Sequence, residues 1–150
     1  MRVDFYRLTR DPAELVVPLI ARATLGAGAR LLVVDADAAR RAAISEALWT
    51  RLPESFLAHG EAAAPHADKQ PILLSGTVEP ANGARYVALA DGHWRPEVVE
   101  DPALGFDRAF LLFGEATIVA AREVWRTIKA RDGLEPHLWR QDGGRWREVG

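Results

Sequence analysis

"ARLLVVDA", residues 29–36, contains the clearest indication of the fold class in this sequence. Its central residues, Leu31 to Val34, are apolar without interruption and include two valines. A strand with one wet face alternates apolar and polar side chains, whereas a continuous apolar run predicts a strand that is covered on both faces. Such strands belong to parallel sheets that carry helices on both sides.

The segments around this strand alternate between strand and helix patterns. Further strands are expected at residues 3–8, 70–76, 84–90 and 106–113, and helices at 11–28, 38–49 and 114–133. Loops are expected at 60–69 and 91–105. This order predicts a single α/β domain over residues 1–150, Rossmann-like and three-layered, with a mainly parallel sheet and helices on both faces. We expect the core to include Leu31, Leu32, Val33, Val34, Ile72, Leu73, Leu74, Phe110 and Leu112.

Residues at the helix ends give more local predictions. Asp11 before Pro12 predicts an N-cap followed by proline at the first helical position. Pro18 should kink the same helix. Either Asp35 or Asp37 is expected to cap the helix that follows the central strand.

Composition excludes several classes of protein. The net charge of -2 gives no overall attraction to nucleic acid or to anionic membranes. Cysteine is absent, which favours a reducing, cytoplasmic environment. No apolar run approaches the ~20 residues that a membrane-spanning helix needs, and the N-terminus lacks the apolar region of a signal peptide.

No catalytic, metal or cofactor site is visible in the sequence. The turn after the first expected strand, "LTRDPAE", has no glycine, although a dinucleotide-binding fold places its phosphate-binding glycines there. The histidines have no metal-ligand spacing, and no serine lies in a nucleophile elbow. Asp35 and the fold layout alone support the alternative, a small Rossmann-like enzyme that acts on a nucleotide or phosphoester.

The helix at 114–133 has two distinct faces, one apolar and one that mixes apolar and basic residues. At about 100° per residue, one stripe is predicted to pack on the sheet, and it contains Ala116, Ala120, Ala121, Val124 and Ile128. A second stripe contains Ile118, Arg122, Trp125 and Lys129, with Arg126 beside it. An outward isoleucine and tryptophan among cations form a mixed basic and hydrophobic strip.

Two interpretations of this strip remain open. The C-terminal segment is predicted to form a hairpin that turns at Asp142-Gly143-Gly144, and its Trp139 and Trp146 could fold over the strip and bury it. A two-residue Asp-Gly turn would place these two indoles opposite each other. Alternatively, the strip is a docking groove for a peptide with a hydrophobic C-terminal residue and a free carboxylate, because tryptophan and arginine are common interface anchors. Trp49, where its helix ends near Arg51, would then be the second wall.

Several segments, in their order and spacing, resemble the chi subunit family of bacterial DNA polymerase III. These are "VDFYRL" at the start, "EALWTRLPESFLAH" at 46–59, "QPILLS" at 70–75, "FDRAFLLFGEA" and "AAREVWRTIKARDG" at 106–133, and "LWRQDGGRWREV" at the end. The resemblance covers nearly the whole chain.

The resemblance implies a non-catalytic accessory subunit of a DNA-directed DNA polymerase, a nucleotidyltransferase, in DNA replication. It implies two partners: the acidic C-terminal tail of single-stranded DNA-binding protein, and the psi subunit of the clamp loader. Trp49, Arg122 and Trp125 match the family's tail-binding positions. The chain departs from the family at Ile118, where well-known members carry lysine, so Arg126 or Lys129 is expected to supply the second charge.

Overall fold

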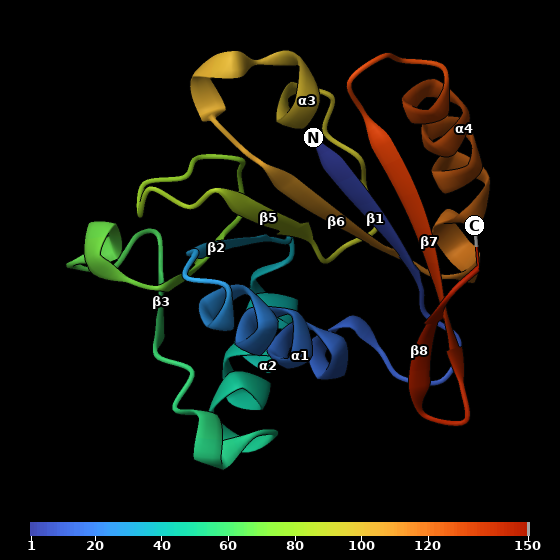
Figure 1. Ribbon diagram of the computed structural model, residues 1–150. Coiled ribbons are helices and arrows are strands. Elements are labelled where there is room, and N and C mark those ends of the chain that lie inside the picture. The colour runs from blue at the N-terminus through green and yellow to red at the C-terminus, as the bar shows by residue number, and fades with distance from the viewer. Residues whose placement is uncertain (150) are drawn as a thin grey trace.

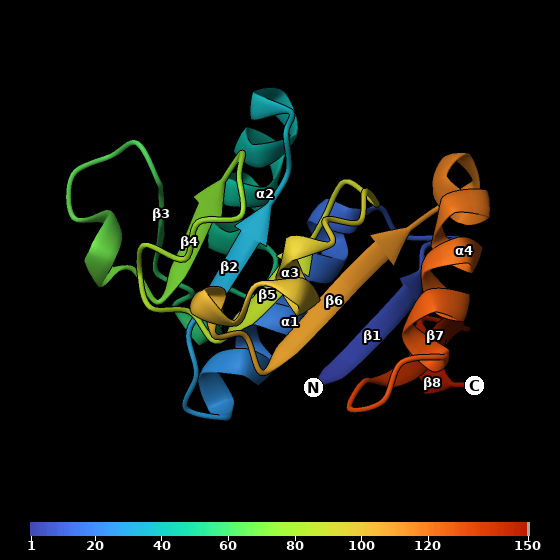
Figure 2. The ribbon, with the colours of Figure 1, turned by 90° about the horizontal axis from the view of Figure 1, so that it is seen from above.

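The computed structural model describes residues 1–149, and its strands form one eight-stranded sheet. The strand order is β3-β4-β2-β5-β6-β1-β7-β8 (Figure 1, with β4 labelled in Figure 2). The strands are β1 (Arg2–Arg7), β2 (Leu31–Val34), β3 (His59–Glu61), β4 (Ile72–Ser75), β5 (Tyr86–Leu89), β6 (Arg108–Phe113), β7 (Glu135–Asp142) and β8 (Arg145–Glu148). All neighbours are parallel except β7 and β8. The mainly parallel sheet that the sequence predicts is confirmed.

The central strand β2 lies between β4 and β5 and is buried along its whole length. Leu31 and Val33 pack into the cluster on one side of the sheet, and Leu32 and Val34 pack into the cluster on the other side. Burial on both faces explains why this segment has no polar alternation. All of the core residues predicted from the sequence are buried.

Helices cover both faces of the sheet. The helices α1 (Ala13–Gly26) and α2 (Ala38–Thr50) pack on one face, and α3 (Glu97–Glu100) and α4 (Ile118–Lys129) pack on the other. Figure 2 shows α4 alongside β1 and β7. The three-layer α/β architecture is therefore also confirmed. Within residues 1–149, no helix combines the length and apolar character that crossing a membrane requires.

The start of α1 differs from the prediction. Pro12 is its N-cap, and no side chain caps the helix there. The carboxylate of Asp11 instead accepts a hydrogen bond from Gln141 Nε2 at 2.7 Å, so it ties this turn to β7. The helix continues through the buried Pro18 as one element.

At the start of α2, the two candidate caps have different roles. Asp37 is the N-cap and accepts a hydrogen bond from the backbone N–H of Ala39 at 2.9 Å. Asp35 is fully buried beneath it and accepts from the backbone N–H of Asp37 at 2.9 Å.

Two predicted loops contain short regular elements. Residues 60–69 overlap β3, which exists through its pairing with β4 and not through any apolar pattern of its own. Residues 91–105 contain α3. The last long helix is shorter than 114–133, because the hydroxyl of Thr117 accepts from the N–H of Gly114 and holds a tighter turn before α4. The 3₁₀ helices are Pro53–Ser55, Ala67–Lys69, Pro102–Leu104 and Glu115–Thr117.

The C-terminal hairpin forms as predicted, but its register differs. The turn residues are Gly143 and Gly144, which both have positive φ, and Asp142 pairs with Arg145. This turn places Trp146 opposite Gln141, so the two indoles do not face each other directly. Both instead contact the ring of Tyr6, with centroid distances of 5.9 Å for Trp139 and 5.0 Å for Trp146.

Candidate functional site

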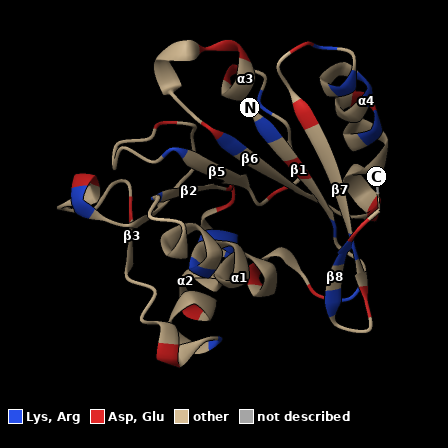
Figure 3. Ribbon diagram, viewed as in Figure 1, with Lys and Arg blue, Asp and Glu red and all other residues tan. Residues whose placement is uncertain are grey.

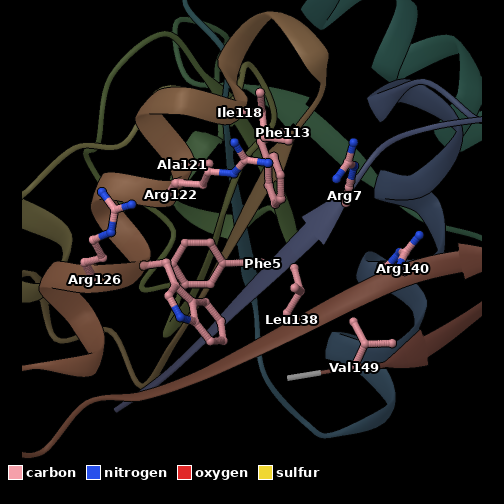
Figure 4. Close-up of a pocket in the computed structure, with 11 residues that line it drawn as sticks. Phe5, Arg7, Phe113, Ile118, Ala121, Arg122, Arg126, Leu138, Arg140 and Val149 are labelled. Carbon is pink, nitrogen blue, oxygen red and sulfur yellow. The ribbon is translucent and has the colours of Figure 1, made fainter.

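A depression of about 520 Å³ lies between α4 and the sheet, near the carboxyl ends of β1, β6 and β7 (Figure 4). In open parallel sheets this edge is where ligands commonly bind. The lining is apolar and cationic, and it includes no carboxylate side chain. The residues that line it are Phe5, Arg7, Phe113, Ile118, Ala121, Arg122, Trp125, Arg126, Leu138, Arg140 and Val149. We call this depression the α4 pocket.

The floor of the α4 pocket is built by rings and leucine from adjacent elements. The ring of Trp125 meets the buried Phe5 edge-on, with centroids 5.1 Å apart and planes at 72°. Phe5 on β1 is the register partner of Leu138 on β7, which brings Leu138 to the same floor. Edge-to-face aromatic packing fixes the indole on one side and leaves part of it open to the pocket.

Arginines from three elements surround this floor. Arg122 and Arg126 come from α4, Arg7 from the end of β1 and Arg140 from β7. Arg126 forms an ion pair with Glu123. Within residues 1–149, the guanidinium groups of Arg7, Arg122 and Arg140 form no ion pair, so the described pocket carries uncompensated positive charge. Figure 3 shows basic residues along α4.

The structure brings together four of the side chains predicted for the site: Ile118, Arg122, Trp125 and Arg126. Lys129 is exposed on the same helix but does not line the α4 pocket. The predicted core stripe of α4 was partly wrong. The exposed residues include Ala116 and Ala120, whereas the half-buried Ile118 and Trp125 pack against the core. Larger side chains gain more from burial than alanine, which turns the helix toward them.

Trp49 does not lie at this pocket, so the prediction that Trp49 and Trp125 flank one site was wrong. Trp49 is at the end of α2, on the opposite face of the sheet, and lines a separate depression with Leu52 and Phe56. Its ring contacts that of His59 with centroids 4.5 Å apart and the planes tilted by 44°. Phe56 is 83% exposed and has a φ of 50°. Positive φ is unfavourable for a bulky side chain, so the local backbone is strained to present this ring.

The hairpin does not place its tryptophans over α4, and that alternative was also wrong. The indole N–H of Trp139 donates to the buried carboxylate of Asp4 at 2.8 Å. Trp146 packs with Tyr6 in the cluster on the face that carries α1 and α2. The hairpin contributes Leu138 to the floor and Arg140 to the wall of the α4 pocket, and Val149, just after β8, adds to the wall without closing the pocket.

The sequence interpretation missed the sheet residues of the site, including Arg7 and Arg140. A usable signal was present, because side chains two positions apart share one face of a strand. Phe5 and Arg7 are spaced in this way on β1, and Leu138 and Arg140 repeat the pattern on β7. Only the strand register shows that the two pairs lie side by side.

Asp35 gives no support to a nucleotide site. Its side chain is fully buried, and burial raises the pKa of its carboxyl group, while the N–H of Asp37 and the nearby Arg40 partly oppose this rise. Two amides of the first turn are also engaged: the N–H of Leu8 donates to the carbonyl oxygen of Phe113, and the N–H of Asp11 donates to the side-chain oxygen of Gln141. Among residues 1–149, no cluster of three or more histidine, aspartate or glutamate side chains could hold a metal ion.

These features define a three-layer α/β protein with an open, apolar and cationic pocket that suits an anionic ligand with a hydrophobic part. The chain belongs to the DNA polymerase III chi subunit family: the family model described as "DNA polymerase III chi subunit, HolC" matches residues 1–137. No curated protein sequence matches the chain. Membership associates the chain with the DNA polymerase III assembly and with DNA replication. The match includes α4 and ends before Leu138, so part of the hairpin wall lies beyond it.

Proposed function

We propose that the chain is a non-catalytic accessory subunit that binds the acidic C-terminal tail of single-stranded DNA-binding protein in the α4 pocket. The observation that carries the proposal is the apolar floor bordered by arginines, with no carboxylate in the lining. A hydrophobic C-terminal residue fits such a floor, and its free carboxylate and acidic neighbours fit the cations. The protein would act in the cytoplasm, where replication proteins work.

Different residues of the pocket would bind different parts of the tail. Trp125 and Phe5 would hold the terminal apolar side chain, and Ile118 would line the wall above it. Arg122 would bind the terminal carboxylate, because its guanidinium lies at the pocket and has no ion pair within residues 1–149. A small, partly electrostatic interface of this kind should have a Kd on the order of micromolar that rises with salt.

A second surface suits the other expected partner, the psi subunit. Trp49 and Phe56 are both exposed, at 56% and 83%, and they lie on the face opposite the α4 pocket. Exposed aromatic rings are costly to keep in water, and Phe56 also lies on a strained turn, so a partner that covers both rings would be favoured. Psi would bind there, so that one chain could hold both partners at once and link the clamp loader to single-stranded DNA-binding protein.

Titration with a labelled tail peptide tests the proposed function. Arg122→Ala should weaken binding by about 2 kcal/mol, because a partly desolvated carboxylate would lose its partner. Val119→Ala is a matched control on the same helix, since Val119 is 72% exposed and does not line the pocket. Equal affinity of the wild type and Arg122→Ala would remove the proposed role of the pocket.

A further inference from the structure

Arg7 and Arg140 form an arginine pair on the sheet side of the α4 pocket. They are register partners on the adjacent parallel strands β1 and β7, and both line the pocket. Adjacent strands lie about 4.8 Å apart, so two cations at paired positions repel each other. Arg7 is half-buried and Arg140 is exposed, and neither forms an ion pair within residues 1–149. An anion between them would relieve the repulsion.

The helix side of the pocket is less suited to a second anion. The guanidinium of Arg126 already pairs with Glu123, one turn away on the exposed surface of α4. Lys129 does not line the pocket. The sequence led us to expect the second charge from Arg126 or Lys129, but the described contacts favour the sheet residues instead.

A second depression adjoins the α4 pocket on its sheet side, next to the arginine pair. This depression of about 340 Å³ shares Arg140 and Val149 with the α4 pocket and extends along the hairpin. Its other lining residues are Gln141, Asp142 and Arg147, and the guanidinium of Arg147 pairs with the carboxylate of Asp142 at 3.0 Å. In Figure 4, Arg7 and Arg140 lie across Leu138 from Phe5, and Arg126 lies on the far side of Phe5. A chain that leaves the floor therefore has an open path past the arginine pair.

We infer that the Arg7–Arg140 pair binds an acidic side chain just before the C-terminal residue of the tail, so that the bound peptide leaves the pocket over the hairpin and not along α4. This inference rests on the proposed function of the α4 pocket. It assigns Arg122 to the terminal carboxylate and the sheet pair to the acidic segment. Selectivity for an acidic tail over a neutral one would then come mainly from β1 and β7.

Two fluorescent peptides distinguish these roles. Both end in phenylalanine with a free carboxylate; one has aspartates before it, and the other has asparagines at the same positions. Arg7→Gln combined with Arg140→Gln should weaken binding of the aspartate peptide about tenfold, as expected for two partly exposed ion pairs, and binding of the asparagine peptide less than about twofold. Arg22→Gln removes an exposed cation of α1 on the opposite face of the sheet; it is the matched control and should change neither affinity by more than about twofold. Arg126→Gln tests the competing path along α4.

Each outcome decides between the claims. Suppose that Arg126→Gln or Lys129→Gln loses affinity only for the aspartate peptide, while the double variant binds it as the wild type does. This result would overturn the inferred path of the peptide over the hairpin and leave the proposed function intact. An equal loss for both peptides in the double variant would also overturn the inference. Failure of both peptides to bind the wild type would remove the proposed function and the inference together. If the double variant unfolds, the single variant Arg140→Gln replaces it, because Arg140 is exposed. This variant should reduce the preference for the aspartate peptide that the wild type shows.

Discussion

Replacing Trp125 by alanine tests whether one side chain both stabilises α4 and forms the pocket floor. Complete burial makes a tryptophan-to-alanine change cost about 3–5 kcal/mol. Trp125 is half-buried, but its edge-on contact with Phe5 at 5.1 Å is a good aromatic pair, which adds about 1 kcal/mol. We therefore expect Trp125→Ala to lower the free energy of unfolding by about 2 kcal/mol.

Urea denaturation followed by circular dichroism measures this loss. Trp125→Phe should lose less than about 1 kcal/mol, because a ring can still meet Phe5. Val119→Ala, at a 72% exposed position on the same helix, should change stability by no more than about 0.5 kcal/mol. The folded fraction of Trp125→Ala should bind the tail peptide at least about tenfold more weakly. Unchanged stability would refute the packing argument, and unchanged affinity would refute the role of the indole as floor.

Three further substitutions probe other parts of the molecule. Trp49→Ala should leave tail-peptide affinity within about twofold of the wild type, because Trp49 lies on the opposite face; calorimetric titration would show a larger change if the two surfaces were one site. Asp4→Ala should lower stability by about 3–5 kcal/mol in thermal denaturation, because the buried carboxylate accepts from two arginines and an indole. Asp35→Asn should raise stability at neutral pH, because burial raises the pKa of Asp35 and makes its charged form unfavourable in the folded state. The stability gained by Asp35→Asn should shrink as the pH falls through that raised pKa, because wild-type Asp35 then becomes protonated. Urea denaturation across a pH series measures this difference in stability. A difference that stays constant with pH would contradict the role of the buried charge.

The fold could be predicted largely because its central strand carries a local signature. Burial of β2 on both faces requires the uninterrupted apolar run at 31–34, and the surrounding pattern gives the helices. The short elements could not be predicted in this way. The strand β3 has three residues with no apolar pattern, and it is defined by its hydrogen bonds to β4.

Part of the candidate site could also be predicted, because a local pattern in the sequence encodes it. Ile118, Arg122, Trp125 and Arg126 share one helix, so helical periodicity alone brings them together. The location of Trp49 depends on which face of the sheet α2 covers, and no local pattern in the sequence encodes that choice. The pairing of Arg7 with Arg140 likewise depends on strand register between segments far apart in the chain.

The central claim, that the α4 pocket binds a peptide through its terminal carboxylate, is tested most directly by one calorimetric comparison. Wild-type protein is titrated with the acidic tail peptide as the free acid and with the same peptide as the C-terminal amide. The free acid should bind with a Kd on the order of micromolar, and the amide should bind at least about tenfold more weakly, because Arg122 would lose its anionic partner. Equal affinities for the two forms, or no binding of the free acid, would contradict it.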